Sequence, residues 1–281
     1  MTGRMETVAD LVADVLAGRR GPDPADVVAT SVFWVHHGTR LAGGNVTYRN
    51  QYLLVRVGTA FGACAFETGE VLPEICADAS GQAVAELLRS DTAVLRVAAL
   101  DAYLGAIAAH RTDPRACVVE LPVGTPEIRA AARDAAVAGL LDVPAGSKVG
   151  LIGVVNPLVA AIRERGAEPL LCDLNLRTTR WGDAVTTDMT EVLDAADAVV
   201  ATGMTIGNGT FDTILARCRE RQVPLVVYAQ TGAAVAREFL GAGLTALSAE
   251  PFPFSQFSAD TTALYVYSSG SPVNARQPST E

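Results

Sequence analysis

The second half of the chain, residues 148–268, alternates short apolar runs with helical patterns, and this alternation constrains the fold more than any other feature. Continuous runs such as residues 148–155 and 223–231 have the length and the β-branched content of buried strands. Between them, apolar residues recur at helical spacing, as in residues 157–166. Strands that are apolar on both faces and alternate with helices are typical of βαβ units, so we predict a mostly parallel sheet.

The first part of the chain has a different pattern. Residues 27–39 and 51–66 are rich in β-branched and aromatic residues, which predicts strands. Turn-forming residues 43–45 between them predict an antiparallel hairpin or a short meander. A helix capped near Ser80 and a second helix over residues 92–109 should follow. Strands followed by helices indicate an α+β segment.

These patterns predict an α/β protein of two domains. Residues 1–113 are expected to form a small α+β domain, and residues 114–270 a Rossmann-like domain with an open, mostly parallel sheet. We expect a linker at residues 111–115 and a helix over residues 126–141. The polar residues 271–281 are expected to be a disordered tail.

The charge balance narrows the range of partners. The chain has 31 acidic and 22 basic residues, a formal net charge of −9, and no basic patch. Nucleic acid and anionic membranes are therefore poor partners, and we expect a small-molecule ligand. No uninterrupted apolar run has the length of a membrane span, and the N-terminus lacks the apolar core of a signal peptide, so we expect a cytoplasmic protein. A homodimer is the default expectation.

Two cofactors are disfavoured by single positions. Lys148 is the only lysine and lies where a strand begins, which suits neither the Schiff base of pyridoxal phosphate nor a phosphate-binding P-loop. The first strand of the parallel sheet ends at Gly153, with no glycine two residues later and with Asn156 and Pro157 at the start of the next helix. A dinucleotide fingerprint needs that second glycine, so NAD is disfavoured.

Ligands of open α/β sheets bind outside the carboxyl ends of the strands, and this rule selects candidate binding residues. Gly153 and Asn156 follow one strand, and Asp173 ends the next, 20 residues after Gly153. An acidic residue at that place binds ribose hydroxyls in adenosine sites, which would suit S-adenosylmethionine. The structural alternative for Asp173 is a helix cap or a salt bridge with Arg177 or Arg180.

Residues 202–210 form a polar, glycine-rich loop between a buried strand and a helix. Exposed amides and hydroxyls in such a loop can hold an anion or a carboxylate, and the alternative is a tight turn that only caps the helix. A second polar loop follows the fourth strand. The candidate binding residues in the two loops are Thr202, Thr205, Asn208, Gly209, Thr210, Gln230 and Thr231.

Candidate metal ligands and proton-transfer groups come from other segments. Glu67 and Glu70 lie in an acidic loop, and with His37 they are candidate ligands of a divalent metal; the alternative is a solvated loop. The adjacent His36 and His37 point to opposite faces of a strand, so they are not expected to bind one metal together. The candidates for a general acid or base are Tyr228, Glu250 and His37.

The loop at residues 202–210 also carries a resemblance. Its Thr-Gly-x-Thr-x-x-Asn-Gly-Thr pattern, with the preceding strand at 150–155, is similar to that of a family of Rossmann-like proteins described as putative heavy-metal chelators. The resemblance implies a first domain like the N-terminal domain of enolase, and a cleft between two domains that handles metal chelates. Two departures are Asp101, where the family leads us to expect asparagine, and residues 229–232, which replace a Gly-Pro-Ser/Thr-type loop.

Two functions from different classes are therefore expected. The first is binding of a small molecule or metal chelate in the interdomain cleft, either as a binding protein or as an enzyme of metallophore metabolism. The second is that of an S-adenosylmethionine-dependent transferase or lyase acting on a small metabolite. The acidic and His-bearing first part of the chain favours the former, and Asp173 favours the latter.

Overall fold

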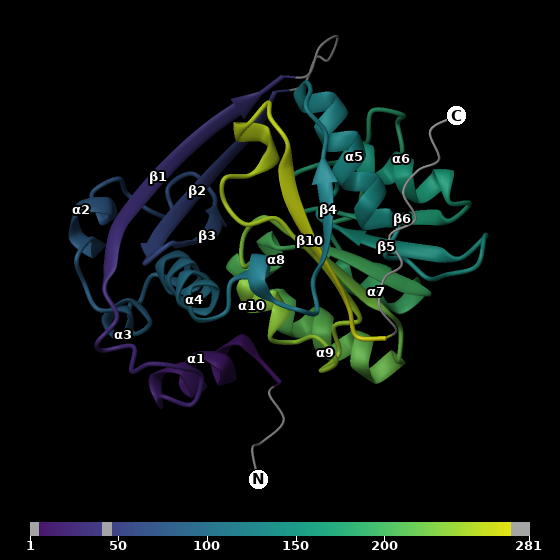
Figure 1. Ribbon diagram of the computed structural model, residues 1–281. Helices are drawn as coiled ribbons and strands as arrows, with labels where there is room; N and C mark the ends of the chain where they lie inside the picture. The colour runs from purple at the N-terminus through teal and green to yellow at the C-terminus, as the bar shows by residue number, and fades with distance from the viewer. Residues whose placement is uncertain (1–5, 41–46, 271–281) are drawn as a thin grey trace.

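The computed structural model describes residues 6–40 and 47–270. The turn expected at 43–45 and the tail expected at 271–281 lie outside the described residues. Within them the chain forms a small antiparallel sheet of three strands and a larger sheet of seven strands, with helices packed around both (Figure 1). The predicted α/β class, with a mostly parallel sheet after a smaller α+β part, is confirmed.

The small sheet has the order β1-β2-β3, and both pairs are antiparallel. Its strands are β1 (Ala29–Thr39), β2 (Tyr48–Val57) and β3 (Ala60–Phe66). The run predicted as one strand over 51–66 turns at Gly58, whose positive φ of 56° favours glycine.

The helices of the first part partly follow the prediction. α4 (Ala93–Ile107) confirms the helix expected over 92–109 and packs closely on β3, because a Cβ at Gly62 would lie 1.9 Å from the backbone nitrogen of Ala102. A helix does follow Ser80, as the single turn α3 (Val84–Leu87), but the predicted cap is wrong. Ser80 instead ends α2 (Ile75–Ala79), where its hydroxyl donates to the carbonyl of Cys76 at 2.7 Å. The first part also contains the helix α1 (Val8–Leu16).

The large sheet has the strand order β4-β10-β9-β8-β7-β5-β6. Its parallel strands are β5 (Lys148–Ile152), β6 (Glu168–Cys172), β7 (Ala198–Thr202), β8 (Leu225–Ala229) and β9 (Ala246–Ala249). Two antiparallel strands complete one edge, β10 (Thr262–Ser268) and β4 (Cys117–Leu121). β4 was not predicted from the sequence.

Helices cover both faces of the large sheet, as in a doubly wound fold. The alternating residues of β7 show this, because Val200 packs in one apolar cluster with α5 and α6, while Val199 packs in another with α7 and α9. The elements of this half are α5 (Pro126–Ala138), α6 (Asn156–Glu164), α7 (Met189–Ala195), α8 (Met204–Gly207), α9 (Phe211–Arg221), α10 (Ala233–Arg237), and the 3-10 turns η1 (His110–Thr112) and η2 (Ser255–Phe257).

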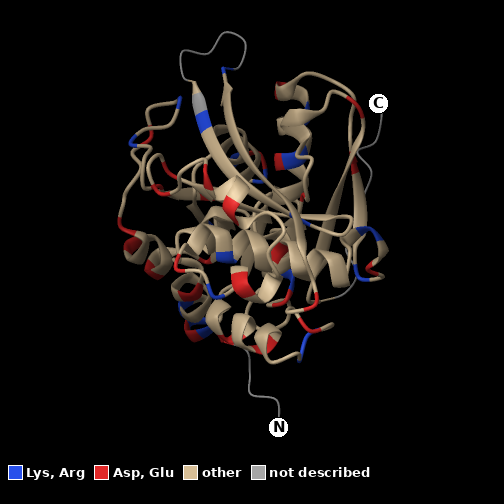
Figure 2. Cartoon of the chain, turned by 90° about the vertical axis from the view of Figure 1, so that its left-hand side faces the viewer, with Lys and Arg blue, Asp and Glu red and all other residues tan. Residues whose placement is uncertain are grey.

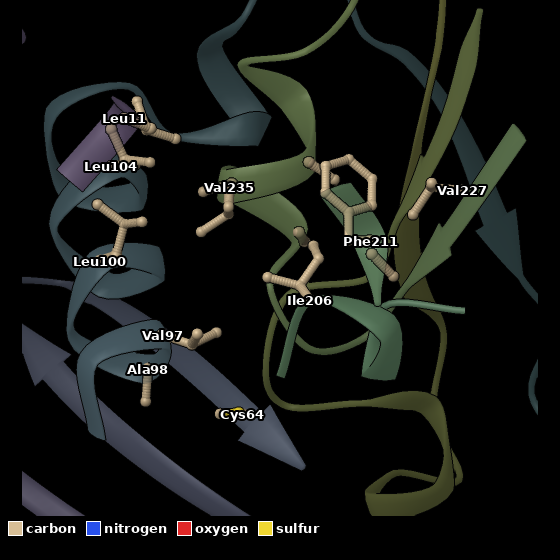
Figure 3. Close-up of a cluster of buried hydrophobic side chains, with 14 of the residues drawn as sticks. Leu11, Cys64, Val97, Ala98, Leu100, Leu104, Ile206, Phe211, Val227 and Val235 are labelled. Atoms are coloured by element: carbon tan, nitrogen blue, oxygen red, sulfur yellow. The ribbon is translucent and has the colours of Figure 1, made fainter. Parts of the chain in front are cut away.

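One continuous apolar core joins the two parts of the chain. Leu11 and Leu100 from the first part belong to the same buried cluster as Ile206, Phe211 and Val235 from the second, and Figure 3 shows α4 facing this second group. Acidic and basic residues are interspersed on the outer helices and loops (Figure 2). The domain limits at 113 and 270 stay a prediction.

The expectation about membrane spans needs a correction. The helical stretch Ala93–Thr112 is long and apolar enough to cross a membrane by length and composition. Arg96 and Asp101 interrupt its apolar run, so the sequence has no uninterrupted apolar stretch of that length. In the folded chain 61% of its apolar window is buried inside the protein, as in the core helix of a soluble domain.

Candidate functional site

A cavity of about 210 Å³ lies at the carboxyl ends of β5, β7 and β8. The strand order reverses here, because β5 is followed in the chain by β6 on one side and then by β7 on the other. Open α/β sheets bind their ligands at such a switch point. We call this the first cavity, and it is bounded by β1, β2, α5 and the segment that includes η2 as well as by the large sheet.

One face of the β1–β2 hairpin forms a wall of the first cavity. His37 and Thr39 of β1 and Asn50 and Tyr52 of β2 line it, and His37 is paired directly opposite Asn50. Side chains alternate between the two faces of a strand, so His36 points away and is exposed, as the sequence indicated. The hairpin thus brings residues of the first part of the chain to the sheet of the second.

His37 contributes its imidazole ring to this wall. Its Nε2 lies 2.7 Å from the hydroxyl of Thr39, and its ring meets the ring of Phe257 edge to face at 5.1 Å. Burial lowers the pKa of His37 below its ordinary value. Its Nδ1 is buried without a hydrogen-bond partner among the described residues. One of the two ring nitrogens of His37 thus has no protein partner among the residues that the structure describes.

One face of α5 forms the opposite wall, with Pro126, Arg129, Ala130 and Arg133. Arg129 is fully engaged with the surrounding protein. Its guanidinium donates to the backbone carbonyls of Pro122, Ser255 and Asp260, and to the hydroxyl of Thr262. The role of Arg129 is therefore to hold the loops around the cavity together.

Arg133 is engaged on one side only. Its Nε donates to the buried carboxylate of Asp134 at 2.8 Å, and its guanidinium carbon lies 5.0 Å from the ring centre of Tyr228. The two terminal nitrogens of Arg133 have no hydrogen-bond partner among residues 6–40 and 47–270. Burial raises the pKa of Tyr228 well above its ordinary value, so its hydroxyl stays neutral. Arg133 therefore presents a partly unsatisfied cation to the cavity.

Six of the residues predicted from the sequence line the first cavity: His37, Asn156, Thr202, Tyr228, Gln230 and Thr231. Gln230 donates to the carboxylate of Glu250 at 2.9 Å and to Gln256 at 2.7 Å. Glu250 itself does not line the cavity. It is 1% exposed and also accepts from the backbone nitrogen of Ser255, so it orients the loops rather than meeting a ligand.

Other predicted binding residues do not line the first cavity but contact the residues and turns that form it. Gly153 has a φ of 86°, and a Cβ there would lie 2.5 Å from the hydroxyl of Thr202. Thr205 donates its hydroxyl to the carbonyl of Thr202 at 2.7 Å. The carboxylate of Asp173 accepts from the backbone nitrogens of Val154, Asn175 and Leu176, which fixes the turn after β5.

The predicted loop at 202–210 is not a single loop, because α8 occupies its middle. Its first residues line the first cavity, whereas Asn208, Gly209 and Thr210 do not. The side-chain oxygen of Asn208 accepts from both the backbone nitrogen and the hydroxyl of Thr210, which makes a local turn before α9. At this end of the loop, the geometry matches the alternative of a tight turn.

Glu67 and Glu70 do not line the first cavity with His37. They follow β3, which β2 separates from β1, so the strand order keeps them away from His37. Glu67 accepts from the side chain of Asn175 at 3.0 Å, and Glu70 accepts from the backbone nitrogen of Glu67 at 2.8 Å. Across the described residues, no group of three or more His, Cys, Asp or Glu side chains could hold a metal.

Several residues of the first cavity were not predicted from the sequence, chiefly Asn50, Tyr52 and Arg133. A signal for α5 was present, because Arg129 and Arg133 are four residues apart on a predicted helix and therefore share a face. Alternation likewise places Asn50 and Tyr52 on one face of a predicted strand.

The fold is Rossmann-like, and its candidate site is bounded on one side by a small antiparallel sheet. Residues 136–248 match the model of the DUF364 family, described as "Putative heavy-metal chelation". The resemblance found in the 202–210 loop is thereby confirmed. No curated protein matches the chain.

Two solved structures of DUF364 proteins, both described as of unknown function, have a similar fold. The protein from Desulfitobacterium hafniense DCB-2 is 14% identical with a TM-score of 0.60, over 92% of this chain and 98% of that one. The protein from Pyrococcus horikoshii is 16% identical with a TM-score of 0.58, over 93% of this chain and 99% of that one. At such identities the similarity concerns the fold.

Proposed function

We propose that the protein binds a small anionic metal chelate, one whose chelator carries carboxylate groups, in the first cavity. The observation that carries this proposal is the guanidinium of Arg133, which faces the cavity with two terminal nitrogens that no described residue engages. The description of the matching family suggests the handling of metal chelates.

The chemistry of Arg133 suits a carboxylate. A guanidinium offers parallel N–H groups that match the two oxygens of a carboxylate, and such charge-assisted bonds are strong away from water. The side chain of Arg133 is only 11% exposed, and the lining of the first cavity includes no Asp or Glu that would repel an anion. Neutral polar side chains of Asn50 and Thr231 border the same space.

The metal is expected to arrive with its chelator rather than to be held by the protein alone. His37 is the one side chain of the cavity lining with a common metal-binding group, and one ligand does not make a stable protein site. Its Nδ1 has no hydrogen-bond partner among the described residues, and burial lowers the pKa of the ring. The chelator would therefore supply most of the ligands, and His37 would complete the coordination.

Titration calorimetry with nickel(II) citrate, citrate alone and nickel(II) alone tests this function. We expect the chelate to bind more tightly than citrate, and nickel(II) alone not to bind in the cavity. Arg133→Gln should weaken binding of both citrate forms by about ten- to a hundredfold, because it removes charge-assisted hydrogen bonds. His37→Ala should remove the preference for the chelate.

A matched control is Arg217→Gln, because Arg217 lies on the surface of α9 and pairs with Asp194 and Glu220. This change should leave the affinities unaltered. Binding of the chelate that persists in Arg133→Gln would contradict the proposed role of the first cavity.

A further inference from the structure

A second cavity, of about 280 Å³, lies between α4, η1, α10 and β10. Its lining is mostly alanine, proline and aromatic side chains, including Phe61, Phe252 and Tyr265. No residue of this lining belongs to the first cavity. The two cavities therefore have separate linings, and both are lined mainly by apolar surface.

An aromatic cluster stands between the two cavities. The ring of Phe254 packs against Tyr52, which lines the first cavity, at 5.3 Å, and against Phe252, which lines the second, at 5.5 Å. Phe254 is fully buried. A molecule in the second cavity would thus be separated from the first by packed rings.

His110 is the unusual residue of the second cavity. It is 6% exposed, its Nδ1 lies 2.7 Å from the hydroxyl of Tyr267, and its ring stacks on Tyr265 at 5.8 Å. Its Nε2 is buried and has no hydrogen-bond partner among the described residues. A buried polar atom without a partner costs free energy, and such atoms in a folded protein call for a specific explanation.

The charges around the second cavity favour an uncharged ligand. Asp101 lines it, but both of its oxygens accept from backbone amides, those of Ala63, Ala234 and Val235. Burial lowers the pKa of His110 to about 3, so its imidazole is neutral near pH 7. Arg111 lines the cavity from an exposed position. Of the charged residues in this lining, Asp101 is thus satisfied by backbone amides, and Arg111 is exposed to solvent.

We propose that the second cavity is a binding site for an uncharged planar ring molecule with one hydrogen-bonding group, which meets Nε2 of His110. Because Nδ1 is hydrogen-bonded to Tyr267, Nε2 is the ring nitrogen of His110 without a partner in the described part of the chain. An apolar cavity of about 150 Å³ already accommodates a benzene ring, so the space suffices for one or two rings. The rings of Phe61, Phe252 and Tyr265 supply apolar contacts.

Phenol is a suitable probe, because it is planar, uncharged near pH 7, and its hydroxyl can donate or accept and thus suits either tautomer of His110. The experiment is a titration of the full chain, labelled with ¹⁵N in its histidines, followed by the ring-nitrogen resonances. We expect a saturable shift at His110, with His36 and His37 unchanged.

Two variants keep the proposal falsifiable. His110→Phe retains a ring beside Tyr265 but removes the ring nitrogens, and should weaken phenol binding by about tenfold. Because this variant lacks the His110 resonance, binding is followed by the line broadening of the phenol signals. Ala263→Leu fills the second cavity from a half-buried position and should prevent binding while His110 is kept. Arg133→Gln, in the first cavity, should leave phenol binding unchanged.

Two results would overturn the proposal. One is a shift at His110 that grows linearly without saturation in the millimolar range, which indicates nonspecific contact. The other is equal affinity for phenol in the wild type and in folded Ala263→Leu. Neither depends on whether the first cavity binds a chelate, because no residue is shared.

Discussion

The carboxylate of Asp101 accepts a hydrogen bond of 2.7 Å from the backbone nitrogen of Ala234, so a side chain of α4 holds the start of α10 in the other half of the chain. The second oxygen accepts from the backbone nitrogen of Ala63 in β3 at 2.9 Å. Asp101 thus connects three elements that form the junction between the two parts. This accounts for an aspartate at a place where the family resemblance led us to expect asparagine, since each oxygen accepts from an amide.

Replacement of Asp101 by asparagine should destabilise the protein. Asparagine offers one acceptor oxygen, and its amide nitrogen would face a backbone donor in a buried place. We expect a loss of about 1–3 kcal/mol at pH 7, the cost of a buried group left unsatisfied. Urea unfolding measures the loss. Asp194→Asn, on an exposed surface pair with Arg217, is the control and should change the free energy of unfolding little.

The stability contributed by Asp101 should depend on pH. Burial raises the pKa of Asp101 from its ordinary 3.8 to about 6. Between these values the unfolded chain releases a proton that the folded chain keeps, so the free energy of unfolding falls as pH rises through this window and is level above it. The group's contribution changes by about 3 kcal/mol. The difference in free energy of unfolding between the wild type and Asp101→Asn should therefore shrink as pH rises from 4 to 6. A difference that stays constant across this range would contradict the raised pKa of Asp101.

Much of the second half could be predicted from the sequence for a local reason. All five residues of β7 are buried, so an uninterrupted apolar run marks the strand without any knowledge of its neighbours. The sequence of β4 has no such uninterrupted apolar run. It is an antiparallel strand with alternating exposure, in which Val118 is 52% exposed, and its partner β10 is far away in the sequence. Its pairing depends on the tertiary fold.

The location of the candidate site could be predicted from the sequence, but the full set of residues that line it could not. The rule about strand ends selected Thr202, Gln230 and Thr231, which do line the first cavity. It could not select Arg133 or Tyr52, because these come from a helix face and a separate sheet whose positions depend on packing. Nor could it show that Asp173, correctly placed at a strand end, is engaged by three backbone amides.

Gly203 tests the close packing behind the first cavity. A Cβ there would lie 2.1 Å from the carbonyl oxygen of Thr231, so Gly203→Ala should push the two loops apart, although its own backbone is helical. We expect a destabilisation of about 1–3 kcal/mol from overpacking, together with weaker binding of nickel(II) citrate. Thermal unfolding and calorimetry measure the two effects.

The matched control for this change is Gly105→Ala. Gly105 lies inside α4, where an added Cβ would meet its nearest neighbour at an ordinary 3.5 Å. Alanine is the better helix former, so this variant should be more stable by about 0.5–1 kcal/mol. Equal effects of the two changes would show that steric contact with Thr231 is unimportant.

A substitution at Asp173 distinguishes a structural role of its carboxylate from a role in binding an adenosyl ligand. If its carboxylate bound ribose, Asp173→Asn would abolish binding of S-adenosylmethionine and leave the stability unchanged. Because the carboxylate accepts from three backbone amides and does not line the first cavity, we expect the opposite result. The variant should lose about 1–2 kcal/mol of stability, while its titration with S-adenosylmethionine should match that of the wild type. Asp142→Asn, at an exposed position, is the control for the loss of one negative charge. A selective loss of S-adenosylmethionine binding in Asp173→Asn, with unfolding unchanged, would restore the transferase or lyase alternative over the binding of a chelate.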